Sequence, residues 1–424
     1  MIVYLMATRK SIDPYKQILA LLFADVQNVT RIVITPTAYR NTIKQIEKRY
    51  ADEGIGFLTK TLPRLGKALD KALTGEYLID AESLRFKAQR NSKLPKLFGE
   101  LFNEVFSSDG QVLHSPCVNC IKALRELLLV FYKLQLPYAL DLEQKVLDQF
   151  IKTESEILPY HERFSIVAEA INENGVLNSS SLLGELYPVV RRARRLLARV
   201  FSGFDYRDIV PRHGPGVVST KERLWGKYFW TRYNERLHTV FPLDEYFHSS
   251  LGHVCDAYPF FERMPIVEPF AQVILVPKDS RGPRLISAEP LEFQWIQQGL
   301  GRSIVEQVER SYVSRYNVHF TDQQPNQFGA LLGSETGKYS TLDLKDASDR
   351  VTVGLVRLLF PKHISDVLEA SRSLATVLPN GKITKLIKFA PMGSALCFPT
   401  LALTIWALLA GGSIDAETRE SLLV

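Results

Sequence analysis

Residues 341–349, which read Thr-Leu-Asp-Leu-Lys-Asp-Ala-Ser-Asp, place three aspartates within seven positions. The apolar run before them predicts a short strand over residues 339–343 that ends at Asp343. A carboxylate at the end of a rigid strand suits Mg²⁺, which prefers oxygen ligands and keeps several of its waters. We therefore predict that Asp343 binds a catalytic metal ion, Mg²⁺ or alternatively Mn²⁺, as two-metal nucleotidyl transfer requires.

The helix predicted over residues 348–359 begins directly after this aspartate cluster. Its start would bring Asp349 or Ser348 close to Asp343, where either could face the sugar of an incoming nucleotide. A purely structural interpretation is as good for Ser348, because serine is a preferred helix cap and an acidic residue suits the first turn.

A second segment, residues 276–290, predicts two short strands joined by a turn and carries cations at every third position, namely Lys278, Arg281 and Arg284. Arginine forks match phosphate oxygens, so these three side chains could hold a triphosphate. The alternative, about as good for this segment alone, is an exposed hairpin whose cations are merely solvated.

A third segment, residues 389–400, contains Gly393 and Ser394 just before a predicted helix over residues 394–410. Glycine allows close backbone approach, and Ser394 could contact a ribose or cap the helix. Residues 389–414 contain no charged side chain, but prolines and glycines interrupt them. We therefore predict a loop followed by a buried helix rather than a membrane span.

Positive charge is concentrated between residues 191 and 227, where ten Lys or Arg face three acidic residues, against a net charge of +6 for the chain. This favours RNA binding, although a solvated helix face would explain the arginines alone. The aromatic-rich residues 225–247 are more typical of a core than of a base-stacking surface. The candidate RNA-binding residues are Arg191, Arg192, Arg195, Arg212 and His213.

With 424 residues and 46% hydrophobic composition, the chain is long enough for several globular parts. Apolar periodicity predicts a mainly helical first half, with helices over residues 121–134 and 181–201. Later strands over 272–276 and 383–389, and a helix over 292–309, indicate an α+β fold. The Cys117–Cys120 pair lacks a second pair at zinc-finger spacing, so we predict loop and core cysteines rather than a zinc site.

The order of the three segments resembles motifs F, A and B of viral RNA-dependent RNA polymerases, and most closely the replicase beta subunit of single-stranded RNA bacteriophages, the leviviruses. Their D-L-S-x-A-S-D is matched by residues 343–349, with Lys345 in place of a small residue. Their M-G-N-G is matched by residues 392–395, with Ser394 where asparagine is common. Their V-P-K-x(5)-R-x(4)-E-P segment is matched by Val276–Lys278, Arg284 and Glu289–Pro290. Their N-D-Q-x-x-N-Q box is matched by Thr321–Gln327, with Thr321 in place of the first asparagine.

The resemblance implies a right-hand polymerase that copies RNA from ribonucleoside triphosphates in the cytoplasm of an infected bacterial host. It divides the chain into an N-terminal helical and fingers region (1–180), fingers with the basic patch and motif F (181–335), and a partial palm (336–424). By the same resemblance, the expected partners are template RNA, host elongation factors Tu and Ts, and a ribosomal protein. We expect no membrane partner.

The sequence also departs from the family pattern. The next family motif, Tyr-Gly-Asp-Asp, supplies further metal-binding carboxylates, but no Gly-Asp-Asp occurs in this chain. We therefore expect a fragment that was truncated before this motif, lacks the thumb and is inactive alone. Two alternatives remain open: the replicase of a capsidless narnavirus-like or mitovirus-like element, and a non-catalytic RNA-binding protein.

Overall fold

The structure is a computed structural model that describes residues 12–30, 32–133, 140–174, 183–280, 282–413 and 422–424. The chain divides into two compact units. Unit 1 contains residues 1–143 together with 277–283, and unit 2 contains residues 144–276 and 284–424. The three-part division expected from the resemblance stays a prediction.

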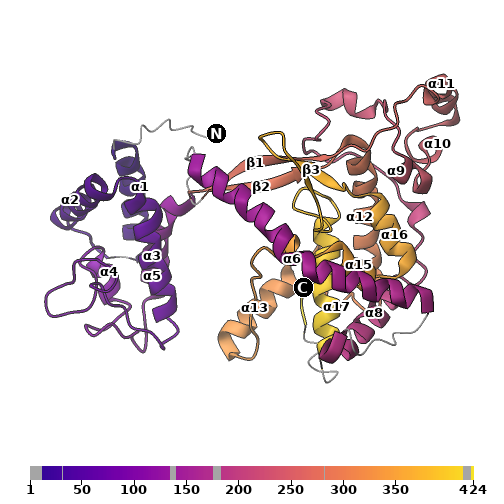
Figure 1. The fold of residues 1–424 in the computed structure, drawn as a ribbon. Coiled ribbons are helices and arrows are strands. Elements are labelled where there is room, and N and C mark those ends of the chain that lie inside the picture. Colours follow the sequence, from indigo (N-terminus) through magenta and orange to yellow (C-terminus); the bar gives the residue numbers. More distant parts are fainter. Residues whose placement is uncertain (1–11, 31, 134–139, 175–182, 281, 414–421) are drawn as a thin grey trace. The chain divides into compact units, whose positions relative to one another are not determined.

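Unit 1 is a helical bundle (Figure 1). Its central helix α5 buries Leu124, Leu127 and Leu128, as its apolar spacing predicted. Cys120 lies in the same core, where burial and the neighbouring Cys117 raise the pKa of its thiol to about 12. A neutral buried thiol packs as a small apolar side chain, which agrees with the predicted core role. The helices are α1 (Asp13–Thr30), α2 (Pro36–Glu53), η1 (Phe57–Thr61), α3 (Leu62–Ala72), α4 (Gly99–Asn103), α5 (Val118–Leu129) and η2 (Val130–Lys133).

Unit 2 combines many helices with a small sheet, an α+β arrangement (Figure 1). The long helix α6 (Leu140–Asn174) contributes its residues from Gln144 onward. The other helices are η3 (Gly184–Leu186), α8 (Tyr187–Val200), η4 (Tyr206–Asp208), η5 (Leu224–Tyr228), α9 (Glu235–Val240), α10 (Leu243–Tyr246), α11 (Leu251–Phe261), α12 (Leu291–Arg310), α13 (Gln324–Thr336), α14 (Ala347–Arg350), α15 (Val353–Leu359), α16 (Lys362–Ala370) and α17 (Cys397–Gly412).

The sheet has the order β2–β1–β3–β4. Strands β1 (Ala271–Asp279) and β2 (Gly282–Ala288) are consecutive in the sequence. Residues 277–283, which include the end of β1 and the start of β2, group with unit 1. Strand β3 (Ala375–Val377) runs parallel to β1 and pairs Thr376 with Ala271. Strand β4 (Ile383–Lys385) runs antiparallel to β3.

The main core of unit 2 is formed largely by α8, α12, α15, α16 and α17. Helix α17 lies alongside α8 (Figure 1), and Gly411 allows the two backbones to approach closely. Leu403, Trp406 and Ala407 of α17 are buried in this core, which confirms the predicted buried helix, although α17 begins at Cys397 rather than at Ser394. Among the residues that the structure describes, no helix has both the length and the apolar character needed to cross a membrane.

Several other predicted elements are confirmed with altered ends. Helix α12 and strand β1 contain the predicted ranges, and residues 211–216 form a loop. The helix predicted over 181–201 is α8 from Tyr187, while residues 181–182 lie outside the described ones. The helix predicted over 121–134 is α5 followed by η2, with residue 134 also outside them.

One expected element was wrong, and two others were confirmed only in part. Residues 339–343 form an irregular segment instead of a strand, and they are exposed. A strand needs a hydrogen-bonded neighbour, and within the described residues no strand pairs with this segment. The helix predicted over 348–359 is interrupted between α14 and α15. The strand predicted over 383–389 is confirmed as β4 only from Ile383 to Lys385, and Lys388 forms an isolated bridge with Thr352.

Candidate nucleotidyl-transfer site

Asp343 lies in the irregular segment between α13 and α14, and its side chain is exposed. Its apolar neighbours Leu342 and Leu344 are exposed as well. Within the described part of the chain, no group of three or more His, Cys, Asp or Glu side chains could hold a metal ion. The segment thus offers one accessible carboxylate but no complete set of protein ligands, so the metal role of Asp343 stays a prediction.

The turn after Asp343 is built around Asp346, which has a left-handed backbone (φ 52°). Its carbonyl accepts a hydrogen bond from the Asp349 amide at 3.0 Å, which closes the turn into α14. One carboxylate oxygen of Asp346 is buried without a hydrogen-bond partner in the structure. The hydroxyl of Ser348 faces the thiol of Cys397 at the start of α17, where burial raises the pKa of the thiol to about 11.

Beside this turn lies a buried lysine that sequence reasoning missed. The side chain of Lys388 is fully buried, and its ammonium donates to the Phe150 carbonyl at 2.9 Å. The same nitrogen lies 3.8 Å from a carboxylate oxygen of Asp349 and 3.8 Å from one of Glu154. One cation on the segment before Met392 therefore lies between carboxylates of α14 and α6.

The electrostatics of this cluster follow from its burial. Burial lowers the pKa of Lys388 and raises the pKa of Asp349, and the attraction between the two groups opposes both shifts. Burial likewise raises the pKa of Glu154, which also accepts hydrogen bonds from the Ile387 and Lys388 amides. Lys388 is itself held by the Phe150 carbonyl, so the cluster also holds the carboxylate of Asp349 in place.

The glycine loop before α17 is held against strand β2. The Ser287 amide donates to the Met392 carbonyl at 2.8 Å. Gly393 has φ 123°, and a Cβ at this position would lie 2.2 Å from the Ser287 carbonyl oxygen. Both the backbone angle and the close approach therefore require glycine, as the sequence predicted.

Ser394 is buried, and its hydroxyl donates to the side-chain oxygen of Gln297 at 2.9 Å. The Ala395 amide donates to the same oxygen, and the Gln297 amide group donates to the Ser371 carbonyl at 2.7 Å. The Ser394 hydroxyl also accepts a hydrogen bond from the Leu396 amide, a local capping contact. The structure thus connects Ser394 to α12, and its predicted ribose contact stays a prediction.

A second buried network contacts the residues that lead into this loop. Arg372 donates to the carbonyls of Leu386, Lys388 and Phe389, the residues that lead into the glycine loop. Glu289 is fully buried and accepts a hydrogen bond from the Ser373 hydroxyl. Burial raises the pKa of the Glu289 carboxyl, whereas the positive charge of Arg372 opposes this shift. Sequence reasoning named Glu289 as a motif residue but did not find its buried arginine.

The predicted triphosphate-binding cations are distributed over the two units. Lys278 belongs to the part of β1 that groups with unit 1, and Arg284 belongs to the part of β2 in unit 2; both are exposed. Arg281 lies outside the described residues. Their common role toward a triphosphate therefore stays a prediction.

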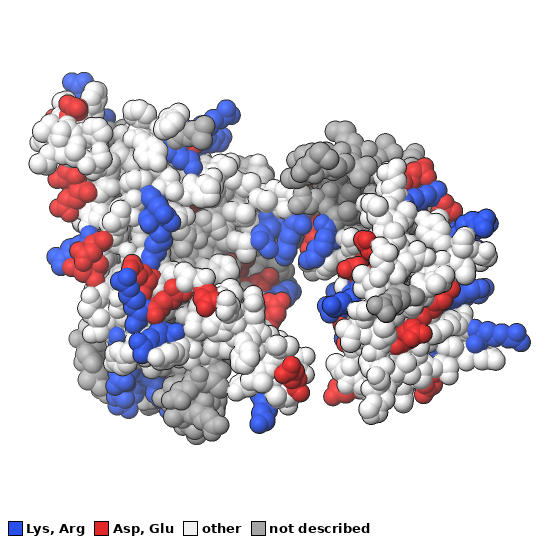
Figure 2. Space-filling model, turned by 180° about the vertical axis from the view of Figure 1, so that it is seen from behind, with Lys and Arg blue, Asp and Glu red and all other residues white. Residues whose placement is uncertain are grey.

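The predicted RNA-binding residues of α8 have mixed environments. Arg191, Arg192 and Arg195 are exposed, but the Arg192 guanidinium also donates to the Gly411 carbonyl at the end of α17. Arg194, which was not a candidate, donates to the Leu358 carbonyl. Figure 2 shows acidic and basic side chains interspersed over one face of the molecule. Part of the positive charge of α8 therefore serves helix packing.

In the following loop, Arg212 is exposed, but His213 is half-buried. The imidazole packs against the rings of Tyr228, Trp230 and Trp295 at centroid distances of 5.0, 5.6 and 4.6 Å. Burial lowers the pKa of His213, so the ring is mainly neutral at pH 7. This geometry suits packing better than an ionic phosphate contact.

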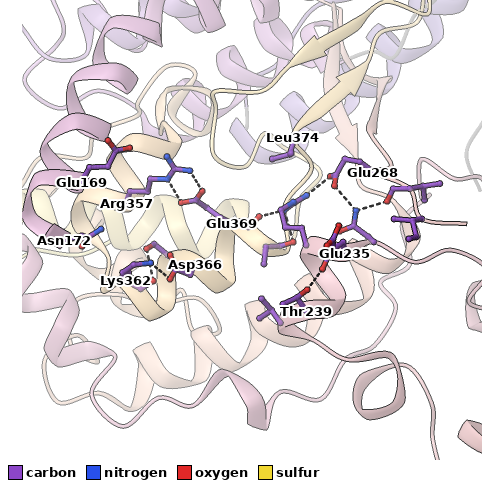
Figure 3. A pocket seen from close by; sticks show the side chains of 18 residues that line it. Glu169, Asn172, Glu235, Thr239, Glu268, Arg357, Lys362, Asp366, Glu369 and Leu374 are labelled. Carbon is purple, nitrogen blue, oxygen red and sulfur yellow. Dashed lines mark hydrogen bonds and ion pairs between the residues drawn. The ribbon is translucent and has the colours of Figure 1, made fainter. Parts of the chain in front are cut away.

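A pocket of unit 2 with a volume of about 1050 Å³ lies elsewhere (Figure 3). Its charged lining is mostly paired internally: Arg357 with Glu369, Arg236 with Glu268, and Lys362 with Asp366. None of the candidate catalytic or nucleotide-binding residues lines it. The pocket therefore does not contribute to the predicted chemistry.

Comparison with known proteins identifies the class. The family model described as RNA replicase, beta-chain, matches residues 183–418, more than half of the chain. The chain belongs to the RNA replicase beta-chain family. The matched range contains the aspartate segment, the hairpin cations and the glycine loop, together with Lys388 and Arg372.

Several phage proteins are similar over part of their length. The chain is 35% identical to the RNA-directed RNA polymerase subunit beta of Qbeta virus (strain MX1) over 52% of this chain and 36% of that protein. It is 27% identical to the corresponding subunit of Enterobacteria phage SP, over 64% of this chain and 45% of that protein. The RNA-directed RNA polymerase beta chain of Escherichia phage MS2 is 28% identical over 32% of this chain and 24% of that protein. The matches thus span less than half of each relative.

The buried cluster generates a stability prediction for Lys388→Met. Removing the ammonium leaves Asp349 and Glu154 without their cation, and breaking a buried ion pair costs about 3–5 kcal/mol. A group whose folded pKa is raised destabilises the fold increasingly as the pH rises from its unfolded pKa to its folded pKa. Without Lys388 the folded carboxyl pKa values rise further, so we expect a larger loss of stability at pH 8 than at pH 5.

The thermal unfolding midpoint at both pH values provides the measurement. Lys382→Met is the matched control, because Lys382 is exposed in the turn between β3 and β4. Equal midpoints for Lys388→Met and Lys382→Met at pH 8 would contradict the role assigned to the cluster.

The glycine loop generates a second prediction. We expect Gly393→Ala to lower stability by about 1–3 kcal/mol, because alanine strains the positive φ and its Cβ meets the Ser287 carbonyl. Gly412→Ala is the control, since a Cβ there meets no atom within 4 Å and φ is not positive. Chemical denaturation of both variants is the measurement; a Gly393→Ala variant as stable as the wild type would refute the close approach.

Proposed function

We propose that this chain forms the fingers and part of the palm of a right-hand RNA-directed RNA polymerase that replicates a single-stranded RNA phage genome. The observation that carries the proposal is the family match, which covers the aspartate segment, the hairpin cations and the glycine loop in their predicted order. The geometry supports it, because Asp343 is accessible, while Asp349 and the glycine loop are each held by buried contacts.

In this proposal Asp343 is one ligand of Mg²⁺ or Mn²⁺. Magnesium is commonly bound by one or two carboxylates together with substrate phosphates and waters, so a single accessible aspartate fits a partial site. Such an ion would supply charge stabilisation for two-metal nucleotidyl transfer. Because the chain contains no Gly-Asp-Asp, we expect the 424-residue polypeptide to be inactive alone and to take part in RNA synthesis only within a complete replicase.

The protein's own residues have distinct proposed roles. Asp349, which lies beside Lys388, faces the ribose of the incoming nucleotide, and Ser348 and Ser394, both close to the start of α17, are further nucleotide contacts. The cations of the β1–β2 hairpin hold the triphosphate, whose β- and γ-phosphates leave as pyrophosphate when the α-phosphate is transferred. Template RNA and ribonucleoside triphosphates are the substrates, and the host elongation factors and ribosomal protein are proposed partners in the bacterial cytoplasm.

Asp343→Asn in the complete replicase tests this function. The substitution keeps the size of the side chain but removes its charge. We therefore expect RNA synthesis to fall at least about 100-fold, a loss typical of removing one key catalytic group. RNA binding should be retained, because the side chain is exposed and supports no packing. Incorporation of labelled nucleotides and binding to a labelled RNA are the two measurements.

The control is Asp256→Asn, at an exposed position on α11. Full synthesis by Asp343→Asn would contradict the catalytic role of Asp343, whereas a complete replicase that binds RNA but synthesises none would favour the non-catalytic RNA-binding alternative. The replicase of a capsidless element is the other candidate, but all of the relatives cited above are phage proteins.

A further inference from the structure

Three aromatic side chains between residues 225 and 229 are exposed, although the aromatic-rich sequence around them predicted a core. The exposed fractions are 81% for Trp225, 57% for Tyr228 and 68% for Phe229. The next residue, Trp230, is buried and donates a hydrogen bond to the Phe247 carbonyl. The fold therefore directs one ring of this run into the core and presents three to solvent, where large apolar rings are costly.

The backbone that carries these rings is well supported. The Lys227 ammonium donates to the Gly216 carbonyl at 2.7 Å, and the His213 imidazole contacts both the Lys227 carbonyl and the Tyr228 ring. Arg232 pairs with Glu222 at 2.6 Å and with the buried Glu292 of α12 at 3.1 Å. The exposed rings thus lie on a segment that is fixed to the core before any ligand binds, which lowers the ordering cost of binding.

The exposed charges of the same segment are positive. Arg212, Lys221 and Arg223 are exposed, and Glu222 is the one acidic residue between positions 212 and 229. Arg232 offsets part of the Glu222 charge, because the same guanidinium also pairs with Glu292. We name the exposed set Arg212, Lys221, Arg223, Trp225, Tyr228 and Phe229 the aromatic–basic surface.

We propose that the aromatic–basic surface binds single-stranded RNA, with bases stacked on its rings and phosphates neutralised by its cations. The proposal deepens, and rests on, the proposed function, because it assigns a docking site for the template strand. Single strands expose the faces of their bases, whereas a duplex hides them, so exposed rings beside cations favour an unpaired strand. A protein partner would use the rings but would not require the positive charge.

The first test is RNA binding by the 424-residue chain. Labelled 12-nucleotide oligouridylate and oligoadenylate serve as probes in fluorescence anisotropy. In Trp225→Ala, the loss of the stacking energy of one base should weaken binding of both probes about 5- to 150-fold. Arg223→Gln should weaken binding mainly at low salt and reduce the slope of log affinity against log salt by about 0.7, the value for one phosphate of a single strand.

The matched control is Tyr160→Ala, because Tyr160 is 60% exposed on α6, outside the surface. Trp225→Phe provides a second variant that separates stacking from folding, since phenylalanine keeps an aromatic face. Trp225 is the most exposed of the chain's four tryptophans, so its fluorescence should be quenched when a base stacks on it. We expect Trp225→Phe to lose this quenching yet keep most of the affinity, whereas Trp225→Ala loses both.

Two results would overturn the proposal: oligonucleotide affinity unchanged in Trp225→Ala, or equal losses in Trp225→Ala and Tyr160→Ala. The first result would leave a protein partner as the occupant of the rings. If the complete replicase still copied RNA in that case, the surface would be refuted while the polymerase function stood. If the surface bound RNA but the complete replicase made no complementary RNA, the polymerase assignment would fail instead.

Discussion

The arrangement of the candidate site depends on the contacts of one fully buried group, the ammonium of Lys388. It contacts α6 through Phe150 and Glu154 and lies beside Asp349 of α14, and it belongs to the segment that continues into the glycine loop. Removing a charge from water is expensive, and nearby carboxylates and a carbonyl offset that cost only when they are held in place. The cluster therefore couples the positions of three chain segments that are far apart in sequence.

The neighbouring buried groups extend this constraint. Arg372 binds the carbonyls just before the glycine loop, and Gln297 of α12 binds its serine. Ser287 fixes the same loop to β2, where only glycine fits at position 393. By contrast, Asp343 lies on an exposed and irregular segment, so the structure fixes the surroundings of the proposed reaction more firmly than the metal-binding carboxylate itself.

Much of this could be predicted from the sequence, for physical reasons that differ between residues. Periodicity predicted α5, α12 and the burial of α17, because each has an apolar stripe or run that must be covered. The role of Gly393 was predicted from its place before a helix. Lys388 and Arg372 were missed, because a single cation looks like a surface residue in the sequence until its distant partners in α6 and at Glu289 are known.

The wrong predictions share a cause, which is that they depended on neighbours that a local pattern cannot show. Residues 339–343 have the composition of a strand, but no described strand pairs with them. The rings of Trp225 and Phe229 were predicted to be core, yet they are exposed, whereas Trp230 of the same run is buried.

The most direct test of the central claim is the sequence of the RNA that the complete replicase makes. A purified replicase that contains this chain would be given a defined single-stranded RNA template, four ribonucleoside triphosphates and Mg²⁺. The account predicts a product complementary to the template that is absent when either the template or Mg²⁺ is omitted. A complete replicase that binds the template but makes no complementary RNA would contradict it.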